Sequence, residues 1–176
     1  MQFNNLFRFC PVCGSASFVQ QNVKSMHCSD CHFSMYINPS AAVAAFILNE
    51  KEELLVTIRA KEPAKNTCDL PGGFVDDHET AEEALRRELN EELGIEVSGV
   101  EYLFSLPNQY LYSGWTIPTL DLFYRVKIGT EIVPKAADDV AACSFIPLHK
   151  LDPQQFGLTS IRNAVSRFVE TYNKSK

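Results

Sequence analysis

Three glutamates stand among leucines in the stretch RRELNEELG, residues 86–94. On a helical wheel advancing about 100° per residue, Glu88 and Glu92 fall inside the apolar arc and Glu91 falls at its edge. Burying an unpaired carboxylate costs on the order of several kcal/mol. Arg87 can pair with one acid but cannot satisfy three, so the pattern indicates a bound cation, with a partly exposed helix edge as the alternative.

The cation that such side chains prefer is a hard divalent ion. Carboxylate oxygens in a partly enclosed site suit Mg²⁺ or Mn²⁺. Proteins usually hold such an ion for phosphate chemistry, because it neutralises the charge on a transferring phosphoryl group. The acidic stretch therefore predicts metal-assisted chemistry on a phosphate-containing substrate.

Two C-x-x-C motifs, CPVC and CSDC, form a second set of residues with distinctive chemistry. Each motif can point two thiolates at one tetrahedral ion, and two motifs complete the shell. Disulfides and unrelated thiols are the alternatives. Because four thiolates leave no open coordination position, we expect structural rather than catalytic Zn²⁺. The expected ligands are Cys10, Cys13, Cys28 and Cys31, without need of His27 or His32, whereas Cys68 and Cys143 are expected to be core or loop thiols.

The longer stretch GFVDDHETAEEALRRELNEELGI, residues 73–95, resembles the Nudix box without a gap. The resemblance implies a Nudix hydrolase, an enzyme that cleaves nucleoside diphosphates linked to another moiety with the help of Mg²⁺ or Mn²⁺. The fixed positions of the box are held here by Gly73, Glu79, Arg87, Glu88, Leu89, Glu91, Glu92, Gly94 and Ile95.

Roles follow from this resemblance residue by residue. It implies that the three helix glutamates hold the metal together with the carbonyl oxygen of Gly73. Glu91 is the expected base that deprotonates the attacking water, with Glu88 and Arg87 as the other catalytic residues. Arg87 and Glu79 are expected to fix the acids in place, as contacts around metal ligands commonly do.

The Nudix family often adds an acidic ligand from beyond the box. Asp138 and Asp139 precede a predicted strand that ends in a family-like sequence at residues 145–148. We favour Asp139 as the added ligand, with Glu131 as its competitor. A solvated loop acid is the alternative for all three.

The cysteine motifs followed by MYINPSAAVAAFI are similar to the NADH pyrophosphatase branch of the family, which has a longer N-terminal domain. That branch carries Ser-Gln-Pro-Trp-Pro-Phe-Pro after the box, where this sequence has SLPNQYLYSG. NAD(H) and ADP-ribose or another nucleotide therefore both stay open as substrates. Aromatic and amide side chains here could stack on or hydrogen-bond a base or ribose, or could pack in a hairpin and the core. These candidate substrate-binding residues are Asn108, Tyr110, Tyr112 and Trp115.

Secondary-structure elements must position these groups. Thr80-Ala81-Glu82-Glu83 is a capping box for a helix that ends at Leu93, before a terminating Gly94. LPGGFVDDHET, residues 70–80, is a predicted loop. A second amphipathic helix is predicted from Ser160. Strands are predicted at 41–48, 53–58, 100–106, 120–128 and 140–146.

These elements predict an α/β fold. The expected architecture is a Nudix-like α/β/α sandwich with a mixed sheet, preceded by a small N-terminal zinc ribbon. The expected domains are the ribbon at 1–38 and a Nudix hydrolase domain at 39–176.

Composition limits the classes of partner. The chain has 176 residues, 45% of them hydrophobic and 22% charged, which is typical of a globular protein. Its net charge of −6 disfavours a nucleic-acid or anionic-membrane binder, because attraction to phosphates needs concentrated Lys and Arg. A bound metal could still supply positive charge for a polyphosphate substrate.

Location and assembly remain expectations. The longest apolar run, residues 41–48, is far shorter than the roughly 18 residues that a membrane span needs. The N-terminus lacks the pattern of a signal peptide, so a cytoplasmic protein is expected, with a homodimer as an option. The rival functions are a Nudix-like module that senses a nucleotide without cleaving it and a ribbon that contacts RNA.

Overall fold

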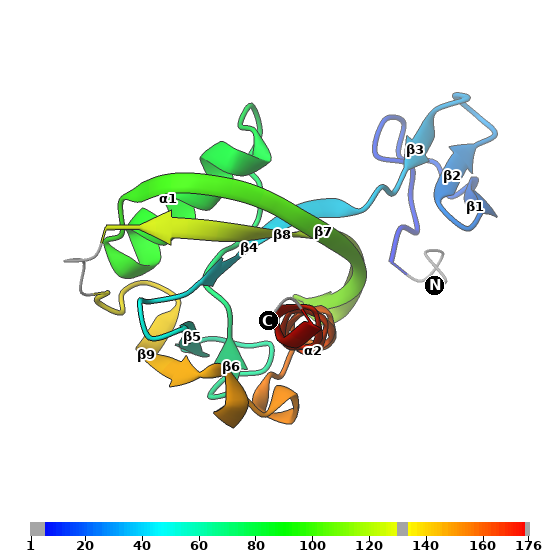
Figure 1. Ribbon diagram of the computed structural model, residues 1–176. Coiled ribbons are helices and arrows are strands. Elements are labelled where there is room, and N and C mark those ends of the chain that lie inside the picture. The colour runs from blue at the N-terminus through cyan, green and yellow to red at the C-terminus, as the bar shows by residue number, and fades with distance from the viewer. Residues whose placement is uncertain (1–5, 130–133, 175–176) are drawn as a thin grey trace. The chain divides into compact units, whose positions relative to one another are not determined.

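The computed structural model describes residues 6–129 and 134–174. Its contacts divide the chain into two compact units, Met1–Pro39 and Ser40–Lys176 (Figure 1). No helix among the described residues has the length and apolar character needed to cross a membrane.

The N-terminal unit is a three-stranded antiparallel sheet in the order β1-β2-β3. The strands are β1 (Phe18–Asn22), β2 (Ser25–Cys28) and β3 (Ser34–Tyr36). Its buried core is small and includes two cysteines among its four members, Cys10, Phe18, Met26 and Cys28. A core of this size rarely stabilises a unit without a metal or disulfides.

The second unit contains two three-stranded sheets. In the mixed sheet, β4 (Ser40–Ile47) is parallel to β8 (Trp115–Ile128), and β8 is antiparallel to β7 (Val97–Tyr112). In the other sheet, β5 (Glu53–Arg59) pairs antiparallel with both β6 (Cys68–Asp69) and β9 (Val140–Pro147).

Two helices cover opposite sides of these strands. Because side chains alternate along a strand, β4 supplies Val43, Ala45 and Ile47 to the core beneath α1 (Ala81–Leu93). The same strand supplies Ala44 and Phe46 to the core beneath α2 (Thr159–Lys174). Two short 3₁₀ helices, Leu148–Lys150 and Pro153–Gln155, precede α2. The predicted α/β/α sandwich with a mixed sheet is confirmed.

Strands β7 and β8 are longer than the sequence predicts. Their pairing continues to Tyr112 opposite Trp115, past Pro107 and Pro118. Proline has no backbone N–H to donate to a neighbouring strand. It is therefore tolerated in an edge strand, where that position can face solvent. β7 is such an edge strand, and Pro118 precedes the segment of β8 that pairs with β4.

Helix α1 begins and ends as the sequence predicts. The Thr80 side chain accepts a hydrogen bond from the backbone N–H of Glu83, and the Glu83 side chain accepts one from the backbone N–H of Thr80. Gly94 ends the helix in the left-handed conformation, with φ of 64°. These caps fix the start and the end of the helix that carries the three glutamates.

Candidate active site

A cavity of about 330 Å³ brings together the acidic face of α1, the loop before it and the ends of several strands. That loop is fixed to β4 by backbone hydrogen bonds, from Val43 to Gly73 and from Ala45 to Pro71. A Cβ on Gly72 would lie 2.1 Å from the carbonyl oxygen of Val43, and its φ is 142°. Only glycine therefore fits this close approach of loop and strand.

Glu92 is the most buried of the three helix glutamates in the cavity. Its carboxylate accepts a hydrogen bond of 3.0 Å from the backbone N–H of Gly72. Burial raises the pKa of Glu92 to about 8, and the negative charges of Glu88, Asp69 and Asp139 add to the shift. A buried carboxylate among other acids is a favourable place for a cation.

Glu88 lies directly against the backbone of the loop. A Cβ on Gly73 would be 2.4 Å from Oε1 of Glu88, so glycine is needed for the carboxylate to reach this position. Burial raises the pKa of Glu88, while Arg87 acts in the opposite direction. The carbonyl oxygen of Gly73 already accepts a hydrogen bond from Val43, which leaves its second lone pair for a metal.

Arg87 contacts more acids than the sequence reasoning allowed. It lies 2.6 Å from Glu79, 2.8 Å from Glu88 and 3.2 Å from Glu91, and it also donates to the carbonyl oxygen of Phe74. The prediction that it pairs with one acid is therefore wrong, because the guanidinium carries five N–H donors. Hydrogen bonds from Arg87 lower the pKa of Glu79. No bond from Arg87 to Glu92 is present.

Glu91 also lines the cavity, but with greater access to solvent. Its side chain is 49% exposed, whereas that of Glu88 is 16% exposed. The helix thus presents three carboxylates at different depths, with the most exposed held by one long hydrogen bond to Arg87.

The acids lying beyond the box also reach this cavity. Asp138 and Asp139 both line it. Lys61 forms ion pairs with both, at 3.6 Å to Asp138 and closer to Asp139. Glu131, the competing candidate, lies outside the described residues.

The donor set of the cavity fits Mg²⁺ or Mn²⁺ by its chemistry, since carboxylate and carbonyl oxygens are the ligands that these ions prefer. Within residues 6–129 and 134–174, only the four N-terminal cysteines bring three or more ligand atoms within 4.8 Å of one another. The glutamates do not converge to that degree, because Arg87 holds Glu88 and Glu91 while Glu92 binds the loop. Gathering them about an ion requires Glu88 and Glu91 to give up part of their contact with Arg87.

The predicted substrate-binding residues divide into two groups. Asn108 and Tyr110 line the cavity, and the Tyr110 ring meets Phe74 edge to face at 5.4 Å between centroids. Tyr112 and Trp115 face each other at the end of the β7–β8 hairpin and are not among the lining residues. The longer hairpin explains this, since it carries the last two side chains past the cavity.

Sequence reasoning missed the polar side of the cavity opposite α1. Arg59 forms an ion pair with buried Asp69 and lies 3.4 Å from the Tyr110 hydroxyl. Buried Asp121 accepts hydrogen bonds from Thr119 at 2.6 Å and Ser160 at 2.5 Å. An acid within the apolar run TLDLFY was a signal that could have been noticed, because a buried acid needs such partners.

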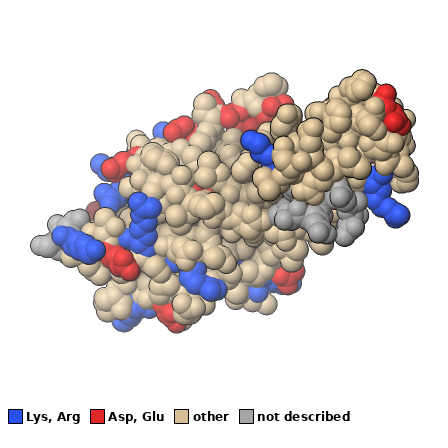
Figure 2. Space-filling model, turned by 90° about the vertical axis from the view of Figure 1, so that its right-hand side faces the viewer, with Lys and Arg blue, Asp and Glu red and all other residues tan. Residues whose placement is uncertain are grey.

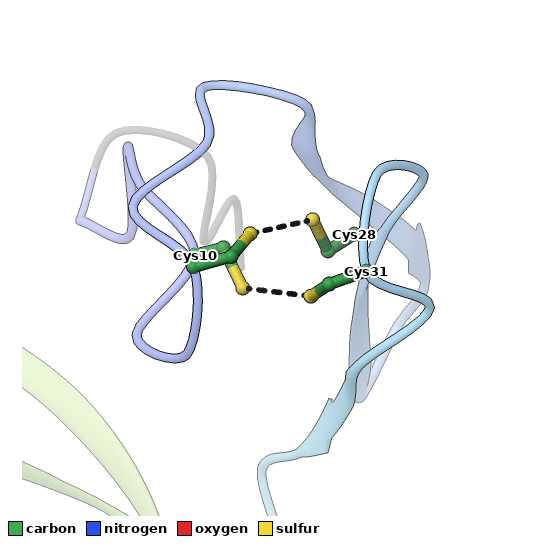
Figure 3. Close-up of side chains that lie close together, drawn as sticks. Cys10, Cys28 and Cys31 are labelled. Carbon is green, nitrogen blue, oxygen red and sulfur yellow. Dashed lines mark hydrogen bonds between the residues drawn. The ribbon is translucent and has the colours of Figure 1, made fainter.

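The four cysteines gather at one point in the N-terminal unit (Figure 3). Sulfur–sulfur distances are 3.6 Å for Cys10 to Cys31 and for Cys13 to Cys28. Sulfurs of a tetrahedral zinc site with Zn–S of about 2.3 Å lie about 3.8 Å apart. All four are free thiols, so their geometry suits a zinc ion and not a disulfide.

The two cysteine turns have matching backbones. Gly14 donates to the carbonyl oxygen of Cys10 at 2.8 Å, and His32 donates to that of Cys28 at 2.9 Å. Both donors have positive φ, 74° and 61°. His27 forms a hydrogen bond with Ser34 through Nδ1. The group of side chains close enough to hold one metal ion consists of the four cysteines and does not include His27 or His32.

Comparison with known proteins identifies the family. The NUDIX domain family matches residues 38–168, most of the chain. The chain belongs to the Nudix family. This Nudix chain is 28% identical over 167 residues to the NAD-capped RNA hydrolase NudC of Pseudomonas aeruginosa, covering 94% of the chain and 55% of that protein. It is 30% identical over 109 residues to Nudix hydrolase 19, chloroplastic, of Arabidopsis thaliana, covering 61% of the chain and 25% of that protein.

Solved structures agree on the Nudix fold. A Nudix hydrolase from Nitrosomonas europaea superposes with a TM-score of 0.74 at 20% identity, covering 96% of this chain and 94% of that one. A MutT Nudix hydrolase from Burkholderia pseudomallei superposes with a TM-score of 0.62 at 25% identity, covering 73% of this chain and 97% of that one. The Nudix chain spans about half the length of the Pseudomonas relative and less of the Arabidopsis one.

Proposed function

We propose that this chain is a metal-dependent Nudix pyrophosphohydrolase that cleaves the pyrophosphate bond of a nucleoside diphosphate linked to another moiety, of the NADH or ADP-ribose class. One observation carries the proposal: the three box glutamates share a single cavity with Arg59, Asn108 and Tyr110. One side of that cavity is suited to a metal and phosphates, and the other to the polar and aromatic groups of a nucleotide.

The metal would be held by Glu88, Glu91, Glu92, the Gly73 carbonyl and Asp139, all of which line the cavity. When bound, Mg²⁺ or Mn²⁺ supplies positive charge for the phosphates and lowers the pKa of a bound water. Lys61 and Arg87 presently contact several of these acids, and both would have to yield contacts to an ion.

Glu91 is the proposed general base. It is the most exposed of the three glutamates, so a water can reach its free oxygen. It would accept a proton from the water that attacks phosphorus. Arg87 would orient Glu88 and Glu91 through its hydrogen bonds to them. Glu79 would in turn hold Arg87 through the 2.6 Å contact.

Asn108 and Tyr110 are the proposed substrate-binding residues. The amide of Asn108 can donate to and accept from a base or ribose. The ring of Tyr110 lines the cavity, and Phe74 lies beside it in the lining. Such walls suit a flat heterocycle.

The Pseudomonas relative is named an NAD-capped RNA hydrolase, which suggests NAD-type substrates, including NAD attached to RNA. The acidic composition disfavours strong binding of an RNA strand, and Figure 2 shows Lys and Arg scattered on one face rather than gathered in a stripe. We therefore propose the dinucleotide or ADP-ribose moiety as the recognised part, with any RNA contributing little.

The N-terminal unit is proposed to be a structural zinc ribbon, with domains at 1–38 and 39–176. Its four free thiols need a reducing compartment, for which the cytoplasm is our proposal. A homodimer is compatible with this function.

The decisive experiment is a substrate panel. NADH, NAD⁺, ADP-ribose and NAD-capped RNA are incubated with the full chain and Mg²⁺ or Mn²⁺, and products are resolved by chromatography. We expect paired products from cleavage between the two phosphates, such as two mononucleotides from NADH. Calorimetric binding of ADP-ribose without any product in either metal would instead support the nucleotide-sensing alternative.

A further inference from the structure

A second cavity, of about 430 Å³, lies where α2 packs near β7 and β8, and it shares no lining residue with the acidic cavity. Its lining includes two arginines, Arg125 from β8 and Arg167 from α2. This volume is within the range of roughly 300–1,000 Å³ typical of small-molecule sites.

Aromatic rings hold both arginines in place. The guanidinium carbon of Arg167 lies 4.1 Å from the ring centroid of Phe104, and that of Arg125 lies 5.9 Å from Phe168. Phe168 is itself stacked on buried Phe46 at 4.1 Å. Cation–π contacts to fixed rings reduce the freedom of the guanidinium groups before any ligand arrives.

The arginines also keep unused hydrogen-bonding capacity. The Nε atom of Arg125 is buried, and it finds no acceptor in the described part of the chain. Its nearest acid partner is Glu101, whose oxygen is 3.8 Å from a terminal nitrogen, beyond hydrogen-bond range. The ion pairs found between described residues do not include Arg167.

One acid, Glu52, also lines this cavity. It accepts a hydrogen bond of 2.5 Å from the hydroxyl of Tyr172, near the end of α2. Two arginines against one glutamate give the lining residues a positive balance, and Glu101, the acid near Arg125, lies outside the lining. A buried donor without an acceptor in a positively charged cavity is a favourable place for an anion.

We propose that this second cavity, separate from the catalytic cavity, is a binding site for a phosphate group, either inorganic phosphate or the phosphate of a mononucleotide. Guanidinium groups bind phosphate oxygens in pairs through their fixed fork of donors, which is why two arginines suit this group. The free anion and the phosphate of a mononucleotide share this chemistry. The proposal does not depend on the hydrolase activity, because no residue is common to the two cavities.

The test is a titration of the full-length chain with its zinc retained and no Mg²⁺ or Mn²⁺ added. It is followed by NMR of the arginine Nε–Hε groups, with inorganic phosphate in one arm and AMP in the other. We expect saturable shifts of Arg125 and Arg167. Shifts of Arg59 and Arg87 report the catalytic cavity instead. Tighter binding of AMP than of phosphate would identify a nucleotide as the ligand, and equal binding would identify the free anion.

Variants make the assignment specific. Arg167→Gln removes a side chain on the exposed surface of α2, and we expect phosphate binding to weaken by about tenfold or more. Lys127→Gln is the matched control, because Lys127 is exposed on the same strand as Arg125, carries the same charge and does not line the cavity. It should bind as the wild type does.

Two results would overturn the proposal. One is a folded Arg167→Gln variant that binds phosphate as tightly as Lys127→Gln. The other is a titration in which only Arg59 and Arg87 respond, since binding would then belong to the catalytic cavity. Hydrolysis of ADP-ribose by Arg167→Gln should stay at the wild-type rate, so failure of one proposal is distinguishable from failure of the other.

Discussion

Neighbouring glutamates of α1 differ in their surroundings although one turn of helix carries them. Glu92 is buried against Gly72, whereas Glu91 is half-exposed beside Arg87. Burial raises the pKa of Glu92 to about 8 because it disfavours the charged carboxylate. A cation beside the carboxylate would offset this cost, so the position is a good site for a cation. Glu91, which solvent can reach, is the glutamate suited to proton transfer.

Glu91→Gln is expected to lower the rate of hydrolysis by about 10²–10⁴, the usual contribution of a general base. The side chain is half-exposed, so the variant should fold normally. Initial rates on the best substrate of the panel, at saturating Mg²⁺, measure the effect. Glu96→Gln is the control, since Glu96 is exposed just beyond the helix and does not line the cavity. Equal rates for the two variants would remove Glu91 from the mechanism.

Gly72→Ala is expected to destabilise the chain by more than about 1 kcal/mol, because alanine suits neither the backbone angle nor the space. The added Cβ would be 2.1 Å from the oxygen of Val43. Urea unfolding measures the loss. Gly114→Ala separates the two causes, since Gly114 also has positive φ, 84°, but its Cβ would meet open space. Equal losses for both variants would mean that the close contact is not important.

At the scale of elements, local signals predicted α1 well and predicted the β7–β8 hairpin only in part. The capping box and Gly94 are short-range features, so the sequence specifies them directly. The length of the hairpin depends on pairing across the sheet, which carries both strands past proline. The two-residue strand β6 was missed for the same reason, since only its pairing with β5 defines it.

Thr80→Ala is expected to destabilise the chain by about 1 kcal/mol through loss of the N-cap of α1. The Thr80 hydroxyl oxygen accepts from the Glu83 backbone N–H at 3.2 Å. The midpoint of urea unfolding, compared with that of Thr80→Ser, measures the effect. Serine keeps the hydroxyl and should retain nearly all the stability. A Thr80→Ala variant as stable as Thr80→Ser would show that the cap contributes little.

At the scale of the whole molecule, two units rely on different sources of stability. Ser40–Lys176 has two extensive buried clusters on either side of its strands. Met1–Pro39 has one small cluster in which cysteines take part. Its fold is therefore expected to depend on the metal, as is usual for small zinc-binding units.

Purified chain is expected to contain about one zinc per molecule, the stoichiometry of one tetrahedral thiolate site. Removal of zinc by a chelator should collapse the NMR dispersion of residues 6–39 and leave that of the Nudix domain, because each unit has its own core. Cys31→Ser is the corresponding variant and should lose zinc. A zinc-free chain with an intact N-terminal sheet would contradict this prediction.

The sequence by itself determined the family, the fold class, the helix that carries the glutamates and the four-cysteine cluster. Each rests on residues close together in the chain or at fixed spacing, so local geometry suffices. Only the tertiary structure decided that Arg59, Asp69 and Asp121 complete the acidic cavity and that Tyr112 and Trp115 lie beyond it. Those relations depend on strand register and on packing between residues far apart in sequence, which no local pattern encodes.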